Sequence, residues 1–133
     1  MNRLEEYISQ NGGKITMDMA YAISSLSILE AHSTLAAESV VKELRDQRQN
    51  LKLIASENYS SLSVQAAMGS LLTDKYSEGF PGHRFYAGCD NVDVIESAAV
   101  EKAKKIFGAD HAYVQPHSGA DANLCAYWAI LNQ

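Results

Sequence analysis

The sequence has little cysteine and no long apolar run. Cys89 and Cys125 are too few for a disulfide framework or a zinc site. We expect both to be reduced, on small side chains that are buried or half-buried. No uncharged apolar stretch approaches the about 18 residues needed to span a bilayer, and residues 1–6 lack the basic and apolar regions of a secretory signal. We therefore expect a cytoplasmic protein without a membrane partner.

Basic residues are also scarce. Lysine and arginine total 11 against 16 acidic residues, a formal net charge of −5, which argues against a nucleic-acid partner. The four histidines show no helix-face pairing for a metal, so we expect no metal site. The glycine-rich nucleotide motifs and the G-x-S-x-G motif are absent. What is present is a globular composition, 47% hydrophobic and 20% charged, in 133 residues.

The hydrophobic pattern predicts mostly helices, over residues 1–11, 17–31, 36–50, 63–72 and 91–107, with a last one entered from 117–123 and running through Leu131. The helix over 91–107 is the best defined, because acidic residues fill its first turns, lysines fill its last, and Gly108 stands at the stop position. Residues 111–115 predict a strand and residues 51–55 a short extended piece. This order of elements predicts an α/β layered domain whose remaining strands are absent.

Functional groups gather in two segments, residues 53–59 and 75–88. Side chains that donate, accept or carry charge there are Glu57, Tyr76, Glu78, His83, Arg84 and Tyr86. Glycines and a proline, which hold unusual backbone conformations, punctuate the second segment. A plain surface loop needs no such combination, so the two segments predict part of an active site.

The residues by themselves leave alternatives open. Glu78 is either a carboxyl held in a tight, aromatic-lined loop for acid/base work or a solvated loop glutamate. Arg84 either grips a carboxylate or phosphate, or closes a structural salt bridge to Glu57 or Asp90. The loop tyrosines, Tyr76 among them, either hydrogen-bond an anion or pack with satisfied hydroxyls.

A second candidate feature is the turn Ser118-Gly119-Ala120 at the start of the last predicted helix. Backbone N–H groups at a helix start are unpaired, and the helix dipole favours an anion there, so the turn suits a phosphate. The alternative is a capping box, in which Ser118 and Asp121 only start the helix. The two interpretations are compatible, because the cap does not need the N–H groups of Gly119 and Ala120.

Three segments closely resemble serine hydroxymethyltransferase: LIASENY at 53–59, KYSEGFPGHRFYAG at 75–88 and VQPHSGADAN at 114–123. Their order and spacing match as well. The resemblance implies a fold-type I transferase that uses pyridoxal 5′-phosphate and moves a hydroxymethyl group between serine and tetrahydrofolate in one-carbon metabolism, interconverting serine and glycine. It covers about residues 40–131 and implies the start of an α/β large domain, with an incomplete sheet, over residues 38–133. The resemblance does not account for residues 1–37, which we expect to form an N-terminal helical arm.

The resemblance also implies roles for single residues, in a homodimer whose subunits share the site. Glu78 becomes the acid/base carboxyl near the serine hydroxyl and the folate, and Tyr86 a catalytic neighbour of the substrate carboxylate. Cofactor contacts then fall on Tyr76, Ser118, Gly119 and Ala120, and substrate contacts on Ser56 and Phe85. Two positions depart from the family pattern. Phe85 replaces a usual tyrosine and loses a hydroxyl, and Ala120 replaces a frequent serine and leaves only a backbone N–H.

The family's cofactor-binding lysine is missing. None of the seven lysines follows the threonine-rich run that marks it, and Lys75 belongs to the loop motif. We therefore expect this chain alone to be inactive, as a fragment of the enzyme. Two alternatives stay open. One is another fold-type I pyridoxal-phosphate enzyme, against which the K-Y-S-E-G-F-P-G loop argues. The other is a non-catalytic helical module that pairs with a full-length subunit.

Overall fold

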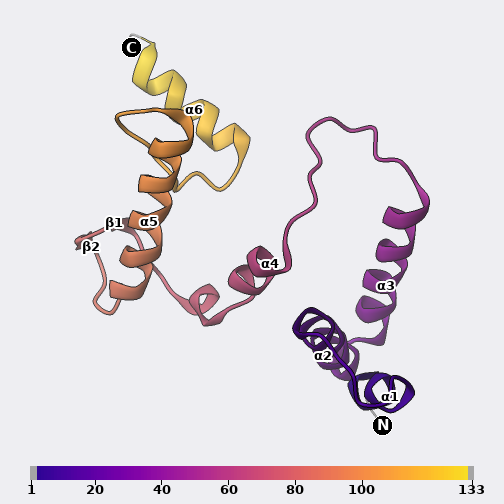
Figure 1. The fold of residues 1–133 in the computed structure, drawn as a ribbon. Coiled ribbons are helices and arrows are strands. Elements are labelled where there is room, and N and C mark those ends of the chain that lie inside the picture. The colour runs from indigo at the N-terminus through magenta and orange to yellow at the C-terminus, as the bar shows by residue number, and fades with distance from the viewer. Residues whose placement is uncertain (1–2, 132–133) are drawn as a thin grey trace. The chain divides into compact units, whose positions relative to one another are not determined.

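The computed structural model describes residues 3–131, and the chain divides into two units, Met1–Ala66 and Ala67–Gln133 (Figure 1). The described part is rich in helix and contains one small two-stranded sheet. None of its helices is long and apolar enough to cross a membrane. Residues 1 and 2, which begin the first predicted helix, and residues 132 and 133, which end the predicted large-domain segment 38–133, lie outside the described residues.

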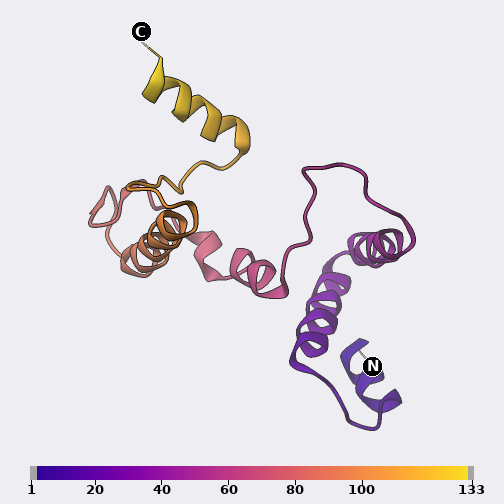
Figure 2. The same cartoon turned by 45° about the horizontal axis from the view of Figure 1, so that its top comes forward.

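The first unit is built from three helices, α1 (Arg3–Gln10), α2 (Met17–His32) and α3 (Thr34–Gln49). α2 contacts both α1 and α3 (Figures 1 and 2). The Arg3 guanidinium donates to both carboxylate oxygens of Glu30 at 2.6 and 2.7 Å, which fastens α1 to α2. Ser33 ends α2 and also caps α3, because its hydroxyl oxygen accepts a hydrogen bond from the Ala36 N–H at 3.3 Å.

The second unit follows α4 (Leu62–Met68), in which the two units meet in sequence. Its elements are the short 3-10 helix η1 (Leu71–Asp74), β1 (Gly79–Phe80), β2 (His83–Arg84), α5 (Asp90–Phe107) and α6 (Gly119–Ile130). The strands are antiparallel, with Gly79 opposite Arg84 and Phe80 opposite His83. Pro81 and Gly82 form the turn between them, and the φ of +74° at Gly82 fits a type II turn, which requires glycine at its third position.

The long predicted helices are confirmed within one to two residues at the described ends. α5 begins at Asp90 and ends at Phe107, and Gly108 takes the left-handed conformation, with φ +61°, that ends a helix. The prediction for residues 63–72 is only partly right, since α4 ends at Met68 and a 3-10 turn follows from Leu71.

Two predictions are wrong. Residues 111–115 form no strand, because no strand of the described chain lies beside them to complete a hydrogen-bonded ladder. Residues 51–54, predicted as a short extended piece, belong to neither a helix nor a strand and lead into a turn at Ala55, so that prediction stays untested. Cys125 is exposed on α6, whereas Cys89 is buried as expected, and both thiols are free. Buried apolar residues of the described chain are confined to Ala37 and Cys89.

Candidate active site

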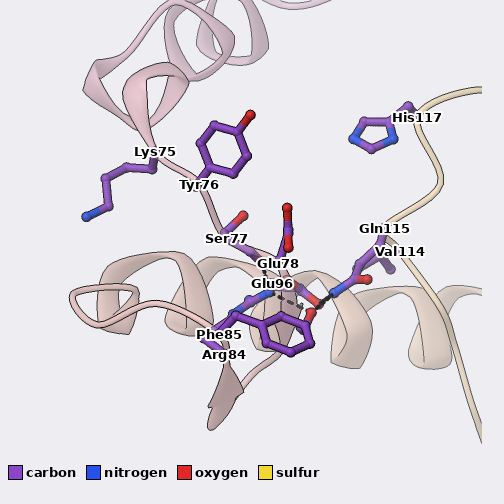
Figure 3. A pocket seen from close by; sticks show the side chains of 11 residues that line it. Lys75, Tyr76, Ser77, Glu78, Arg84, Phe85, Glu96, Val114, Gln115 and His117 are labelled. Atoms are coloured by element: carbon purple, nitrogen blue, oxygen red, sulfur yellow. Dashed lines mark hydrogen bonds and ion pairs between the residues drawn. The ribbon is translucent and has the colours of Figure 1, made fainter.

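A cavity of about 730 Å³ opens in the second unit, between the 75–85 loop, α5 and the segment before α6 (Figure 3). Its lining is polar and aromatic, and it includes four of the residues singled out from the sequence, Tyr76, Glu78, Arg84 and Phe85. The lining residues are Lys75, Tyr76, Ser77, Glu78, Gly79, Arg84, Phe85, Glu96, Val114, Gln115 and His117. The segments that the sequence placed about thirty residues apart, 75–88 and 114–123, therefore contribute to one cavity.

Arg84 forms the base of this cavity. Its side chain is 5% exposed; its Nε donates to Asp93 Oδ1 at 2.7 Å, and its Nη2 donates to Glu96 Oε2 at 2.6 Å. A buried cation is tolerated only when it is paired and hydrogen-bonded, and two carboxylates on one face of α5 meet that need. The structural salt bridge foreseen for Arg84 is thus present, but its partners are Asp93 and Glu96 rather than Glu57 or Asp90.

The same network shifts the ionisation of its members. The hydrogen bond that Asp93 Oδ2 accepts from the Gly82 backbone N–H, at 2.8 Å, and the neighbouring Arg84 guanidinium hold the pKa of Asp93 below its usual value. Hydrogen bonds to Glu96 and Asp93 raise the pKa of Arg84. Both shifts favour the charged forms of Asp93 and Arg84, which strengthens the ion pair between them.

Arg84 also fixes the backbone on both sides of Glu78. Its Nη1 donates to the carbonyl oxygens of Ser77 and Gly79 at 2.6 and 2.9 Å, and the Phe85 N–H donates to the carbonyl oxygen of Glu78 at 3.1 Å. Three successive carbonyls are therefore held, while the Glu78 side chain stays exposed. Figure 3 shows its carboxylate pointing away from the guanidinium, with Tyr76 to one side and His117 to the other. A carboxyl held in this way can exchange a proton with a bound molecule.

The two loop tyrosines pack against each other. The rings of Tyr76 and Tyr86 lie edge to face, with centroids 6.0 Å apart. Tyr76 lines the main cavity, and its backbone oxygen accepts a hydrogen bond from the buried Cys89 thiol at 3.4 Å. Tyr86 lies outside that lining, beside a smaller hollow next to Asp93. The neighbouring Phe85 ring lines the main cavity and is largely exposed.

The predicted phosphate turn begins α6. Ser118 Oγ accepts a hydrogen bond from the Asp121 N–H at 3.1 Å, so the capping interaction is present. Among residues 3–131 the N–H groups of Gly119 and Ala120 have no hydrogen-bond partner, and nothing lies within 4 Å of where a side chain on Gly119 would stand. The turn therefore leaves the N–H groups of Gly119 and Ala120 free for an anion, so the helix cap and an anion site are compatible here.

Two predicted residues, Ser56 and Glu57, belong to the first unit. Ser56 lies in a turn after Ala55, and the Glu57 carboxylate pairs with the Lys52 ammonium at 3.0 Å. Sequence reasoning missed Asp93, Glu96 and Gln115 as parts of the site. The spacing of Asp93 and Glu96, three residues apart on one helix face, was the available signal. The part of the chain that the structure describes holds no cluster of three or more acidic, histidine or cysteine side chains placed for a metal ion.

An exposed carboxyl on a rigid loop, phenol groups and a helix start with free N–H groups are the features of part of an enzyme. Known proteins identify which one: the sequence model of serine hydroxymethyltransferase matches residues 29–133. The serine hydroxymethyltransferase of Treponema pallidum (strain Nichols) is 63% identical over 111 residues, covering 84% of this chain and 19% of the relative. That of Mycolicibacterium smegmatis is 57% identical over 116 residues, covering 87% and 24%. The chain belongs to the serine hydroxymethyltransferase family.

The comparisons also bear on how far the likeness extends along the chain. The serine hydroxymethyltransferase of Chlamydia trachomatis serovar D is 52% identical over 133 residues, which is 100% of this chain and 27% of the relative. The likeness thus reaches beyond the segment where the motifs lie. The chain spans between 19% and 27% of the length of these relatives.

Proposed function

We propose that this chain contributes to a pyridoxal-phosphate enzyme that interconverts serine and glycine, with transfer of the hydroxymethyl group to tetrahydrofolate. Family membership and the anchored Glu78 loop support the proposal. In this proposal residues 1–37 form a helical arm, and residues 38–133 form the start of a fold-type I large domain. The complete enzyme is a cytoplasmic homo-oligomer whose site is shared between subunits.

The residues present fit the phosphate of the cofactor. The free N–H groups of Gly119 and Ala120 lie at a helix start, where a phosphate is favoured, and the hydroxyl of Ser118 borders them. The Tyr76 hydroxyl adds a neutral donor, in our proposal to the site of a neighbouring subunit. Pyridoxal phosphate, when bound, supplies an electron sink for the substrate. This chain's share of that task is to hold the phosphate.

The remaining roles concern the substrates. Glu78 is proposed to take and return the proton of the serine hydroxyl, because its carboxylate faces the cavity while its backbone is fixed. Tyr86 is proposed to lie by the substrate carboxylate, Ser56 to contact the amino acid, and Phe85 to stack on folate. Phe85 is suited to stacking, since its ring lines the cavity and the residue is 78% exposed.

Glu78→Gln tests the proposal. The experiment uses the complete enzyme, meaning the full-length protein that carries this chain, or this chain joined to the remaining part of the Treponema pallidum relative. Because an amide cannot exchange the proton, we expect tetrahydrofolate-dependent serine cleavage to fall by roughly 10² to 10⁴-fold. Retention of the cofactor, measured from its absorbance after dialysis, should be unchanged.

The matched control is Glu101→Gln, which removes an exposed carboxylate of α5 that pairs with Lys104 at 2.9 Å. We expect it to leave both measurements at their original values. Loss of the cofactor from the Glu78 variant, in step with the loss of activity, would show that Glu78 is structural and would remove it from the mechanism.

A second candidate function is a non-catalytic helical module that pairs with a full-length subunit. The observation that favours it is the exposure of large apolar side chains, among them Leu53, Phe107 and Trp128. The downstream reading frame separates the two candidates. A threonine-rich lysine motif after Gln133 supports the enzyme, and a stop codon at that point supports the module. The family match argues against a different fold-type I enzyme.

A further inference from the structure

The Gln115 side chain joins two segments that the sequence keeps far apart. Its Nε2 donates to the carbonyl oxygen of Gly79 at 2.8 Å, across 36 positions of the chain, and to Glu96 Oε1 at 2.7 Å. Its own Oε1 accepts a hydrogen bond from the Tyr113 hydroxyl at 3.3 Å. The side chain is partly buried, and its amide uses both N–H donors on groups of the candidate site.

These bonds close a ring with Arg84. The Gly79 carbonyl oxygen accepts from both Arg84 Nη1 and Gln115 Nε2, at 2.9 and 2.8 Å. The two oxygens of Glu96 are likewise divided between Arg84 and Gln115. Each of the four residues in the ring thus contacts two others. Removing the Gln115 amide leaves one oxygen lone pair of the Glu96 carboxylate and one of the Gly79 carbonyl without a partner in a partly buried place.

The segment around Gln115 has little else of a polar kind to hold it. Within residues 3–131, the backbone groups of 111–117 make no backbone–backbone hydrogen bond, in keeping with the absence of the predicted strand. A tilted contact between the rings of Tyr113 and Phe80, 6.3 Å apart, is its aromatic tie to the hairpin. The amide of Gln115 is therefore the polar link that holds this segment to the Glu78 loop.

The link has a place in the proposed chemistry, on which this inference rests. Gln115 stands three residues before Ser118, where the phosphate turn starts, and it bonds to the carbonyl that follows Glu78 in the chain. We propose that Gln115 is a positioning residue that sets the placement of the acid/base carboxyl relative to the phosphate-binding turn. It touches neither substrate nor cofactor, and it acts through Gly79 and Glu96.

Gln115→Met in the complete enzyme tests this role. Methionine has a similar length and fills the same space without the hydrogen bonds. Because a small misplacement of a catalytic group is costly, we expect kcat for serine cleavage to fall roughly 10- to 100-fold. KM for serine and cofactor retention should stay near their original values, and the melting temperature should fall by only a few degrees, because two acceptors each lose one partner. The matched control is Gln47→Met, which removes an exposed amide whose partner is Glu43 on α3, and it should change none of these.

A double-mutant cycle with Glu78→Gln separates positioning from general structure. If Gln115 acts through Glu78, then Gln115→Met causes little further loss of kcat once the carboxyl has been replaced. Losses that multiply in the double variant, or loss of the cofactor in step with kcat, would overturn the role. An inactive unsubstituted enzyme would overturn the proposed function itself, whereas an active one with an unaffected Gln115→Met variant would overturn only the positioning role.

Discussion

Gly79 shows how much of the site depends on a single backbone position. Its φ is +103°, and a Cβ built there would lie 2.3 Å from the carbonyl oxygen of His83 across the hairpin. Its own carbonyl accepts hydrogen bonds from Arg84 and Gln115. Only a residue without a side chain can pair this closely with the opposite strand and still present that carbonyl to both donors.

Gly79→Ala is therefore expected to destabilise the complete enzyme by about 1–3 kcal/mol from the backbone conformation, with a further cost from the overlap at His83. Urea unfolding followed by circular dichroism measures the change. Gly108→Ala is the matched control, because φ at Gly108 is +61° but nothing lies within 4 Å of the added methyl group. The control should cost only about 1–2 kcal/mol. Equal urea midpoints for the two variants would show that the hairpin yields to the methyl group.

At the scale of elements, the helices were predictable and the contacts between elements were not. Apolar spacing and end signals are local, so α2, α3 and α5 followed from the sequence. The strand over residues 111–115 failed, because β-forming side chains specify no strand without a neighbour to pair with.

The candidate site divides in the same way between local and non-local features. The cap at Ser118 and the glycines of the 75–88 loop could be read from local sequence. The partners of Arg84 could not, since the acidic residues nearest to it in sequence are Glu78 and Asp90, whereas the fold presents Asp93 and Glu96. The contacts of Gln115 were the hardest to predict from the sequence, because its two acceptors lie 36 and 19 residues earlier in the chain.

The tie between the hairpin and α5 gives a prediction on pH. Because the folded state lowers the pKa of Asp93, its carboxylate stabilises the fold fully above its ordinary pKa of about 3.9, and the contribution is lost as the pH falls through the lower folded value. In the complete enzyme, Asp93→Asn should lower the melting temperature at pH 7, and the gap to the unsubstituted enzyme should narrow below about pH 4. Asp18→Asn, at an exposed first-turn residue of α2, is the control. A gap that stays constant with pH would show that the charge of Asp93 is irrelevant to stability.

At the scale of the whole molecule, the apolar surface is mostly uncovered. Within the described chain only Ala37 and Cys89 are buried apolar residues, while side chains as large as Trp128, Phe107 and Leu53 are 70%, 82% and 89% exposed. Burial of apolar surface is the main term that favours folding, so a chain of this length needs far more burial to unfold as one cooperative unit. The chain spans 19% of the length of its Treponema pallidum relative, and in the proposed enzyme further chain is expected to cover such faces.

The 133-residue chain alone is accordingly expected to keep helical circular dichroism but to melt gradually, to bind a hydrophobic dye and to associate in gel filtration with light scattering. It should also show no serine cleavage when pyridoxal phosphate is supplied, because its lysines lack the family's cofactor-binding context. The complete enzyme, compared at equal concentration, should unfold in one sharp thermal transition and should not increase the fluorescence of the dye. If the chain alone has a single size, binds no dye and unfolds in a sharp transition, the two units bury their apolar faces by themselves. The apolar faces would then no longer support either a larger domain or a partner.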